Sequence, residues 1–428
     1  MKNYAMLSRD ELQKEQAILA NEMALCKAKN LDLNMARGKP GADQLDLSMP
    51  MLSILNQDSN IKDAIDGTDC RNYSTPATLC GTPEARTLFG EYLGASKEQT
   101  IVVGSTSLSF MYDCLAKAML TGVLGSEKPW SQEKIKFLCP VPGYDRHFSI
   151  CEFLGIEMIS IPCDDNGPDM DQIEKLVSTD ASIKGMWCVP KYANPSGITY
   201  STEVLTRMAN LAPLAKDFRI FCDNAYAMHQ IYEDTYLPNL LELFEKAGNP
   251  NMIYIFGSTN KITFPGAGVA FFAASKENIA FAEKQLSMQA IGYDKLNMLR
   301  HVRFLKDIDG IKAHMAKHAD ILRPKFDAVI SALETEVAPR GAGTYTKPMG
   351  GYFVTYYAPK GCAKRIVALC KEMGVVLTGA GATYPYGKDP DDSCLRIAPS
   401  FPSANELTDA MVVFCIAARI ATIEKYLA

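Results

Sequence analysis

One lysine, Lys261, stands in a short polar turn between two apolar runs, within IYIFGSTNKITFPGAGVAFF from Ile253 to Phe272. The flanking runs have the length and the β-branched and aromatic content of buried strands. A lysine held between two core strands is partly desolvated, which lowers the pKa of its amine and makes it a usable nucleophile toward a carbonyl. The alternative is a solvated lysine in a hairpin loop.

A carboxylate, Asp223, ends the strongly apolar run FRIFCD. An unpaired carboxylate in such surroundings is costly to desolvate, so it needs a cationic or hydrogen-bonding partner. The protonated nitrogen of a pyridine cofactor is such a partner, whereas a helix cap after the strand is the alternative. With Lys261 in the same chain, we expect the pyridine partner.

A third candidate is the turn in TIVVGSTSLSFMYD, which joins an apolar strand to a long apolar helix. Ser105, Thr106 and Ser107 then fall at a helix N-terminus. Free backbone N–H groups, hydroxyls and the positive end of the helix dipole attract a phosphate there. An ordinary Ser/Thr cap is the alternative.

Six motifs of this kind, in a fixed order from about Asn34 to Pro402, resemble the fold-type I pyridoxal-phosphate-dependent aminotransferases. STNKITFPGAG is the most specific of them, and the chain looks closest to the aspartate aminotransferase subgroup related to MocR-type aminotransferase domains. The resemblance implies an α/β fold with a mostly parallel central sheet and a smaller α/β domain formed by both chain ends. It also implies pyridoxal 5'-phosphate as the cofactor.

The resemblance assigns roles to individual residues. Lys261, Asp223 and Tyr226 would be catalytic, Tyr144 would stack on the pyridine, and Arg396 would clamp the substrate α-carboxylate. The implied cofactor-binding set is Ser105, Thr106, Ser107, Tyr144, Asn194, Asp223, Tyr226, Ser258, Lys261 and, from across a dimer, Tyr73. The implied substrate-binding set is Gly38, Asn194, Arg396 and Arg37. Core tyrosines, an Asn-Pro turn and solvated arginines are the structural alternatives.

One position departs from the pattern. Many relatives carry a phosphate-binding arginine eight residues after the lysine, and here that position is Val269. Phosphate binding would then depend on the hydroxyl groups named above and on another cation.

The predicted activity is ping-pong transamination between an L-amino acid, aspartate, and 2-oxoglutarate. Another amino acid aminotransferase or a lyase on the same fold is the alternative. A dicarboxylate needs a second cation, for which the candidates are Arg37, Lys39, Lys295, Arg300 and Arg303; the arginine fork favours Arg37 or Arg300. A MocR-like regulator is disfavoured, because about 30 residues precede Asn34 and a winged-helix module needs more.

Strand and helix patterns alternate between about residues 100 and 272, which indicates a parallel sheet covered by helices. We expect this sheet to position the candidate residues. We expect residues 1–60 to form an arm belonging to the small domain, 61–305 the large cofactor-binding domain and 306–428 the small domain. Within the arm, Ser8 and Glu11 predict a capping box that begins a helix, which we expect to pack on a partner surface.

The amino-acid composition limits the kinds of partner that the chain is expected to bind. The chain has 428 residues, of which 47% are hydrophobic and 22% charged, and its net charge of −5 favours neither nucleic acid nor an anionic membrane. Its 13 cysteines are scattered and have no C-x-x-C spacing, as expected for reduced thiols in the cytoplasm. No signal-like or membrane-spanning apolar run occurs. His314 and His318 lie on a helical stretch with the spacing of a metal pair but no obvious third ligand, so we expect an exposed helix face there and no metal.

Overall fold

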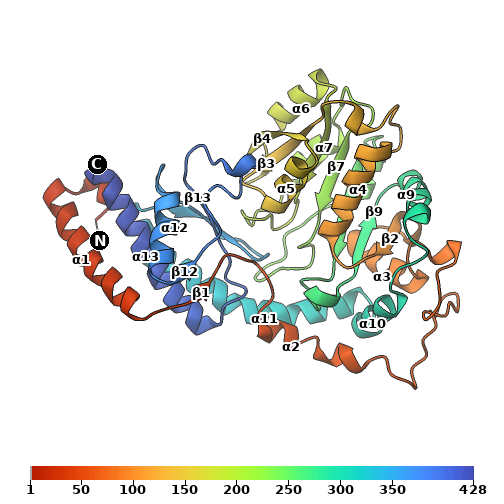
Figure 1. The fold of residues 1–428 in the computed structure, drawn as a ribbon, viewed down its shortest axis with the longest axis horizontal. Helices are drawn as coiled ribbons and strands as arrows, with labels where there is room; N and C mark the ends of the chain where they lie inside the picture. The colour runs from red at the N-terminus through yellow and green to blue at the C-terminus, as the bar shows by residue number, and fades with distance from the viewer. Residues whose placement is uncertain (1) are drawn as a thin grey trace.

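The computed structural model describes residues 2–428, which fold around an eight-stranded and a three-stranded sheet (Figure 1). The large sheet has the order β2-β9-β8-β7-β6-β3-β4-β5. Its strands are β2 (Thr100–Val103), β3 (Lys136–Val141), β4 (Glu157–Asp164), β5 (Gly167–Pro168), β6 (Ile183–Cys188), β7 (Arg219–Asp223), β8 (Ile253–Ser258) and β9 (Ala270–Ala273).

Five neighbouring strands of this sheet, β8, β7, β6, β3 and β4, run parallel, whereas β9 is antiparallel to both β2 and β8. Every residue of β7 and β8 is buried, because helices cover both faces of the sheet. The predicted mostly parallel central sheet is therefore confirmed.

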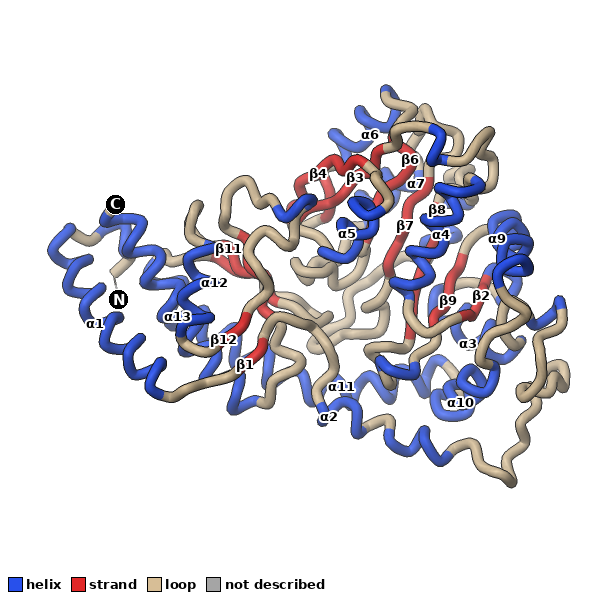
Figure 2. The backbone as a smooth tube through the Cα atoms, in the orientation of Figure 1, coloured by secondary structure: helices blue, strands red, loops and turns tan. Residues whose placement is uncertain are grey.

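The helices of the large sheet form two layers with separate apolar cores (Figure 2). One core takes residues from α3 (Pro83–Leu93), α6 (Met170–Thr179), α7 (Thr202–Ala209), α8 (Leu240–Lys246) and α10 (Lys295–Leu305). The other takes residues from α4 (Ser107–Thr121), α5 (Asp145–Phe153) and α9 (Lys276–Gln289).

The order of the strands brings two predicted site residues to one edge. β7 and β8 are parallel neighbours, with Asp223 paired in register with Phe256, so both strands end at the same side of the sheet. The turn that carries Lys261 follows β8 directly and leads into β9. Asp223 and Lys261 therefore meet at the carboxyl ends of the strands, where ligands bind in open parallel sheets.

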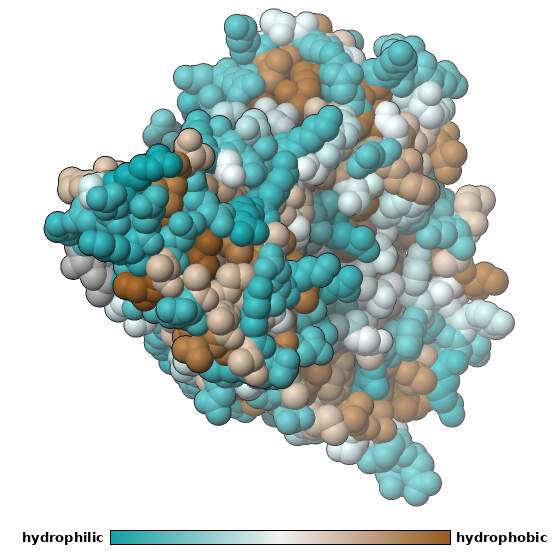
Figure 3. Space-filling model, turned by 60° about the vertical axis from the view of Figure 1, so that its left-hand side comes forward, coloured by the Kyte–Doolittle hydropathy of each residue, from teal (hydrophilic) through white to brown (hydrophobic). Residues whose placement is uncertain are grey.

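Both ends of the chain contribute to the smaller body (Figure 1). Its antiparallel sheet consists of β10 (Thr344–Tyr345), β11 (Val354–Tyr357) and β13 (Cys394–Ile397). Its helices are α1 (Arg9–Ala28), α12 (Ala363–Glu372) and α13 (Ala404–Leu427), and β1 (Leu33–Asn34) pairs with β12 (Val375–Val376). With this end of the molecule turned forward, its surface mixes hydrophilic and hydrophobic side chains (Figure 3).

Helix α1 begins with the predicted capping box, in which Ser8 Oγ accepts from the Glu11 amide and the Glu11 carboxylate accepts from the Ser8 amide. Within its own chain α1 lies along α13, and its packing on a partner surface stays a prediction. Arg419 of α13 joins the two ends of the chain by donating to Tyr4 Oη and Glu15 Oε1 at 3.0 and 2.8 Å.

One helix is shared by both bodies. Ile311 and Met315 of α11 (Ile308–Ala332) pack in the core of the large sheet, whereas Leu322, Phe326 and Val329 pack in the core of the smaller body. The domain boundaries at residues 60 and 305 stay a prediction. Across residues 2–428, no helix is long and apolar enough to cross a membrane.

Candidate active site

A cleft of about 320 Å³ opens at the carboxyl edge of the large sheet. It brings together eight residues that the sequence predicted for the site, although they come from segments far apart in the chain. These are Arg37, Gly38, Tyr144, Asn194, Asp223, Tyr226, Lys261 and Arg396.

The amine of Lys261 lies deep in this cleft, with Nζ 4.9 Å from the ring centre of Tyr226. Burial lowers the pKa of Lys261, and the nearby Asp223 carboxylate opposes that shift. The lowered pKa increases the fraction of neutral amine, which is the nucleophilic form. The surrounding strands thus provide the desolvation that the sequence predicted.

Asp223 is 5% exposed, and its two oxygens have different surroundings. Oδ2 lies 3.1 Å from His147 Nε2, and the His147 ring is held by stacking on Trp187 at 4.2 Å between ring centres. Oδ1 is buried and has no hydrogen-bond partner in the described chain. A buried carboxylate oxygen without a partner is costly, so this atom fits a ligand donor such as a pyridine N–H.

The two tyrosines of the cleft are held in their protonated form. Burial raises the pKa of Tyr144 to about 12, and burial also raises the pKa of Tyr226. Tyr144 lies at the start of α5, with its ring 4.9 Å from the ring centre of His147. At neutral pH both phenols are therefore hydrogen-bond donors.

Arg396, from β13, closes the opposite wall of the cleft. Its Nη1 donates to Asp145 Oδ1 at 2.9 Å and to Asn194 Oδ1 at 3.1 Å, and its guanidinium lies 4.8 Å from the ring centre of Phe353. The arm reaches the same wall, because Gly38 packs so closely on Phe353 that an added Cβ would come within 2.3 Å of the ring. A side chain at residue 38 would push the arm away from the cleft.

The predicted phosphate-binding residues lie beside the Lys261 turn rather than in the lining of the cleft. Thr106 caps α4 by accepting from the Ser109 amide at 3.0 Å. The carbonyl of Ser105 packs against Gly268. Gly104, at φ +63°, has open space where a Cβ would stand, which leaves room for a ligand at this helix N-terminus.

Three other positions named from the sequence, Ser258, Tyr73 and Val269, lie in different surroundings. Ser258 is buried at the end of β8, next to the Lys261 turn. Tyr73 is 76% exposed and lies outside the cleft of its own chain. Val269 is buried in an apolar core, so that position cannot offer a cation to a phosphate.

The candidate cations separate into two groups. Arg37 and Lys39 line the cleft, whereas three others are engaged elsewhere. Those three are Lys295, which donates to Ser74 Oγ at 3.2 Å, Arg300, which donates to Asn297 Oδ1 at 2.5 Å, and Arg303, which pairs with Glu84 at 2.6 Å. In this chain the last three do not line the cleft.

Sequence reasoning missed several lining residues, of which Asp145 and Arg146 are the charged ones. Both follow Tyr144 directly and occupy the first turn of α5, and their adjacency to a predicted stacking residue was a usable signal. His147, one residue further, could have been found in the same way. Val189, Ala225 and Phe353 are apolar lining residues whose local sequence gives no such signal.

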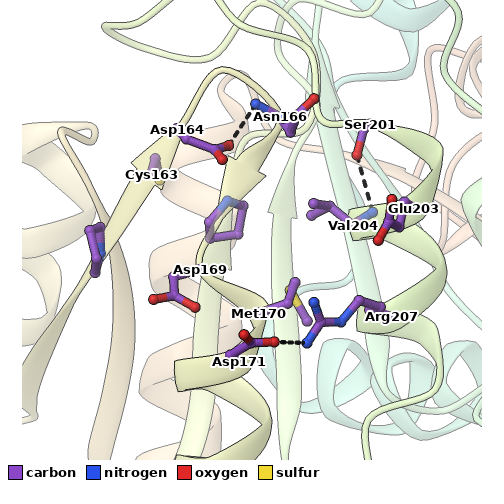
Figure 4. Close-up of a pocket in the computed structure, with 12 residues that line it drawn as sticks. Cys163, Asp164, Asn166, Asp169, Met170, Asp171, Ser201, Glu203, Val204 and Arg207 are labelled. Atoms are coloured by element: carbon purple, nitrogen blue, oxygen red, sulfur yellow. Dashed lines mark hydrogen bonds and ion pairs between the residues drawn. The ribbon is translucent and has the colours of Figure 1, made fainter.

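A second hollow, of about 510 Å³, lies at the β4–β5 edge of the sheet (Figure 4). Of its lining residues that the structure describes, Arg207 alone is cationic, and it already pairs with Asp171 and Glu174. The lining also carries Asp164, Asp169 and Glu203. Such an acidic hollow repels amino acid and oxo acid carboxylates, so the Lys261 cleft is the better candidate.

The lysine, the unpartnered Asp223 oxygen and the adjoining helix N-terminus together fit pyridoxal phosphate. Comparison with known proteins points the same way. The family described as "Aspartate amino-transferase" matches residues 7–428. A Corynebacterium glutamicum aspartate aminotransferase is 40% identical over 438 aligned residues, covering 100% of both chains. A protein of Mycolicibacterium smegmatis, whose name assigns it provisionally to the aminotransferases, is 44% identical over 99% of both chains. The crystal structure of an aspartate transaminase from C. glutamicum superposes with a TM-score of 0.94 at 40% identity, covering 98% of both chains.

Proposed function

The chain belongs to the aspartate aminotransferase family, and from that premise we propose that it transfers the amino group of aspartate to 2-oxoglutarate. Transamination and the pyridoxal phosphate cofactor come with the family, whereas the dicarboxylate substrates are our proposal. The observation that carries it is the charge of the cleft, where Arg37, Lys39 and Arg146 accompany Arg396. A second carboxylate entering a partly desolvated pocket needs such a cation.

In this proposal the protein side chains have distinct tasks. Pyridoxal phosphate supplies an electron sink for the electron pair left when an amino acid loses its α-proton. Lys261 holds the cofactor, and its Nζ then accepts and returns the α-proton. Asp223 Oδ1 accepts a hydrogen bond from the pyridine nitrogen, which keeps that nitrogen protonated.

The remaining residues bind and orient. Arg396 binds the α-carboxylate, and Asn194 and Tyr226 donate to the phenolic oxygen of the cofactor. Tyr144 stacks on its ring. The N-terminus of α4, with Ser105, Thr106, Ser107 and Ser258, binds the phosphate, helped by Tyr73 from a partner subunit.

For the side-chain carboxylate, Arg37 and Arg146 are the preferred partners, because a planar guanidinium can bind a carboxylate through two hydrogen bonds. Lys39 is the weaker candidate, since its Nζ lies 3.9 Å from the ring centre of Phe401. We also infer a homodimer and a cytoplasmic location; the 13 free cysteines support the latter, since free thiols persist in a reducing compartment.

A substrate panel tests the proposal. The purified holoenzyme is given aspartate, alanine, leucine or phenylalanine with 2-oxoglutarate, and both the oxo acid and the glutamate formed are measured. We expect the highest kcat/KM for aspartate and equal amounts of the two products. Far higher efficiency with a monocarboxylic amino acid would contradict the dicarboxylate proposal, and product without glutamate would indicate a lyase.

Variants then identify the cation. Arg37→Gln and Arg146→Gln are compared with Arg300→Gln, which removes the same charge outside the cleft. The correct variant should lower kcat/KM for aspartate about tenfold to several hundredfold while changing alanine turnover little, because an unpaired carboxylate costs several kcal/mol. A selective loss in Arg300→Gln would instead assign the cation to the partner subunit.

A further inference from the structure

Arg396, the residue proposed to bind the substrate α-carboxylate, is already ion-paired inside the cleft. Its Nη1 lies 2.9 Å from Asp145 Oδ1. Asp145 is in the first turn of α5, where the helix dipole favours a negative charge, and Arg396 is on β13 of the smaller body. The pair therefore joins the two bodies across the cleft.

The two partners differ in their access to water. The side chain of Arg396 is 6% exposed, so its charge requires a counter-ion, whereas the side chain of Asp145 is 31% exposed. Losing the pair would leave Arg396 with a buried, uncompensated charge, but Asp145 can regain water at its exposed edge. Asp145 is thus the partner that can leave at the lower cost.

Neutral groups hold the guanidinium in place independently of Asp145. Nη1 also donates to Asn194 Oδ1 at 3.1 Å, Nη2 donates to Thr378 Oγ1 at 3.3 Å, and the Phe353 ring lies under the guanidinium. Nε is buried without a partner in the described chain. Arg396 therefore keeps its orientation when Asp145 departs, and its remaining N–H groups suit an incoming carboxylate.

We propose that Asp145 is a displaceable counter-ion for Arg396, which neutralises the guanidinium between turnovers and gives way to the α-carboxylate of each substrate. Asp145 then weakens substrate binding, because every amino acid and oxo acid must replace one carboxylate by another. This inference rests on the proposed role of Arg396, but it holds for any side-chain specificity, since all substrates carry the α-carboxylate.

Three variants separate this role from a fixed structural one. Asp145→Asn keeps the shape and removes the charge, Asp145→Glu keeps the charge, and Asp165→Asn removes the same charge from an exposed position outside the cleft. Asp145→Asn holoenzyme should show a KM at least about tenfold lower for both the amino donor and the oxo acid acceptor, the size expected for one hydrogen bond between charged groups. Its kcat should change less than about threefold. Asp165→Asn should keep KM values near those of the wild type, and Asp145→Glu, which retains the charge, should have higher KM values than Asp145→Asn.

Thermal unfolding of the same holoenzymes gives a readout besides turnover. Without added carboxylate, Asp145→Asn should melt below the wild type, because Arg396 loses its counter-ion; in saturating succinate the two proteins should melt together. A KM that is unchanged or higher in Asp145→Asn, or a stability deficit that persists in succinate, would show that Asp145 is a permanent partner and overturn the proposal. A similar fall of KM in Asp145→Glu would overturn it too.

A failure of the dicarboxylate proposal can be distinguished from a failure of the displacement proposal. If aspartate is not preferred, the dicarboxylate proposal falls, yet the KM of the amino acid that is preferred should still decrease in Asp145→Asn. If Arg396→Lys leaves the KM of every substrate unchanged, the α-carboxylate binds elsewhere and the displacement proposal falls with it.

Discussion

Asp223 Oδ1 is a buried polar atom of the cleft that has no hydrogen-bond partner among residues 2–428. Its position at the end of an apolar strand was visible in FRIFCD, as was the place of Lys261 between two strands. The contacts of Asp145 were not visible, since it meets Arg396 across 251 residues of chain and only the assembled fold brings them together. Site chemistry that depends on burial can thus be predicted from local sequence, whereas chemistry that depends on contacts between residues far apart in the chain cannot.

Lys261 is expected to be the lysine that binds the cofactor covalently. Borohydride reduction of the holoenzyme followed by peptide mass spectrometry should place the pyridoxyl group on Lys261. Lys261→Ala should lose both the absorbance of the bound cofactor and transamination. A label on another lysine would refute the assignment.

Asp223→Ala is expected to keep the fold but to lower the rate of the half-reaction with an amino acid about 100- to 1000-fold, as when a preorganised polar group is removed from an active site. Single-turnover kinetics measure that rate, and circular dichroism checks the fold. Asp217→Ala is a matched change of a buried carboxylate, which lies outside the cleft and binds Lys184 and Trp130. Near-normal rates in Asp223→Ala would leave Asp223 with a structural role alone.

At the scale of elements, buried polar contacts behind the Lys261 turn connect three segments. Tyr352 Oη donates to the carbonyl of Lys261 at 3.3 Å and accepts from Gln44 Nε2 at 3.0 Å. Gln44, in α2 (Ala42–Asp46), also meets His318 of α11, which lies 3.2 Å from His314. The helical stretch that carries His314 and His318 was predicted correctly, but their face is buried, not exposed as expected. The face was misjudged because α11 packs on both bodies, a placement that helical periodicity does not contain.

His318 makes stability sensitive to acid. Burial lowers its pKa from 6.5 to about 4, so on acidification the unfolded chain takes up this proton first. The contribution of His318 to stability is therefore complete above pH 6.5 and declines as the pH falls toward 4. Lowering the pH from 6.5 to 4.5 should reduce the free energy of unfolding of the wild type through protonation of His318 in the unfolded chain. In His318→Gln we expect this reduction to be about 2 kcal/mol smaller. Urea titrations of the holoenzymes at these two pH values measure the difference, and parallel curves would contradict the expectation.

At the scale of the whole molecule, one chain brings the Lys261 cleft together but leaves Tyr73 exposed and outside it. The predicted dimer explains that exposure, since Tyr73 would enter the cleft of the partner. The fold class followed from the strand and helix order, whereas the assembly requires a surface that no single-chain pattern encodes.

Complementation tests the shared site. Lys261→Ala and Tyr73→Ala proteins, each with strongly reduced activity, are mixed under conditions that allow subunits to exchange. A hybrid dimer contains one cleft with both wild-type residues, so activity should rise above that of either variant, toward a quarter of the wild-type value if exchange is statistical and the sites are independent. An active monomer in analytical ultracentrifugation, or no recovery after verified exchange, would rule out the shared site.

The packing of α1 on α13 also determines when α1 can make its native contacts during protein synthesis. α1 ends at residue 28 and α13 begins at residue 404, so the ribosome must add 376 further residues before the helix that covers Leu12, Leu19 and Cys26 starts to emerge. At about 5–20 residues per second this takes roughly 20–75 s. Throughout that interval the apolar side chains Leu12, Leu19 and Cys26 lack their native cover, while the strands of the large sheet are still being made. Within residues 2–428, α1 is therefore made well before α13 and cannot reach its native packing until α13 has emerged.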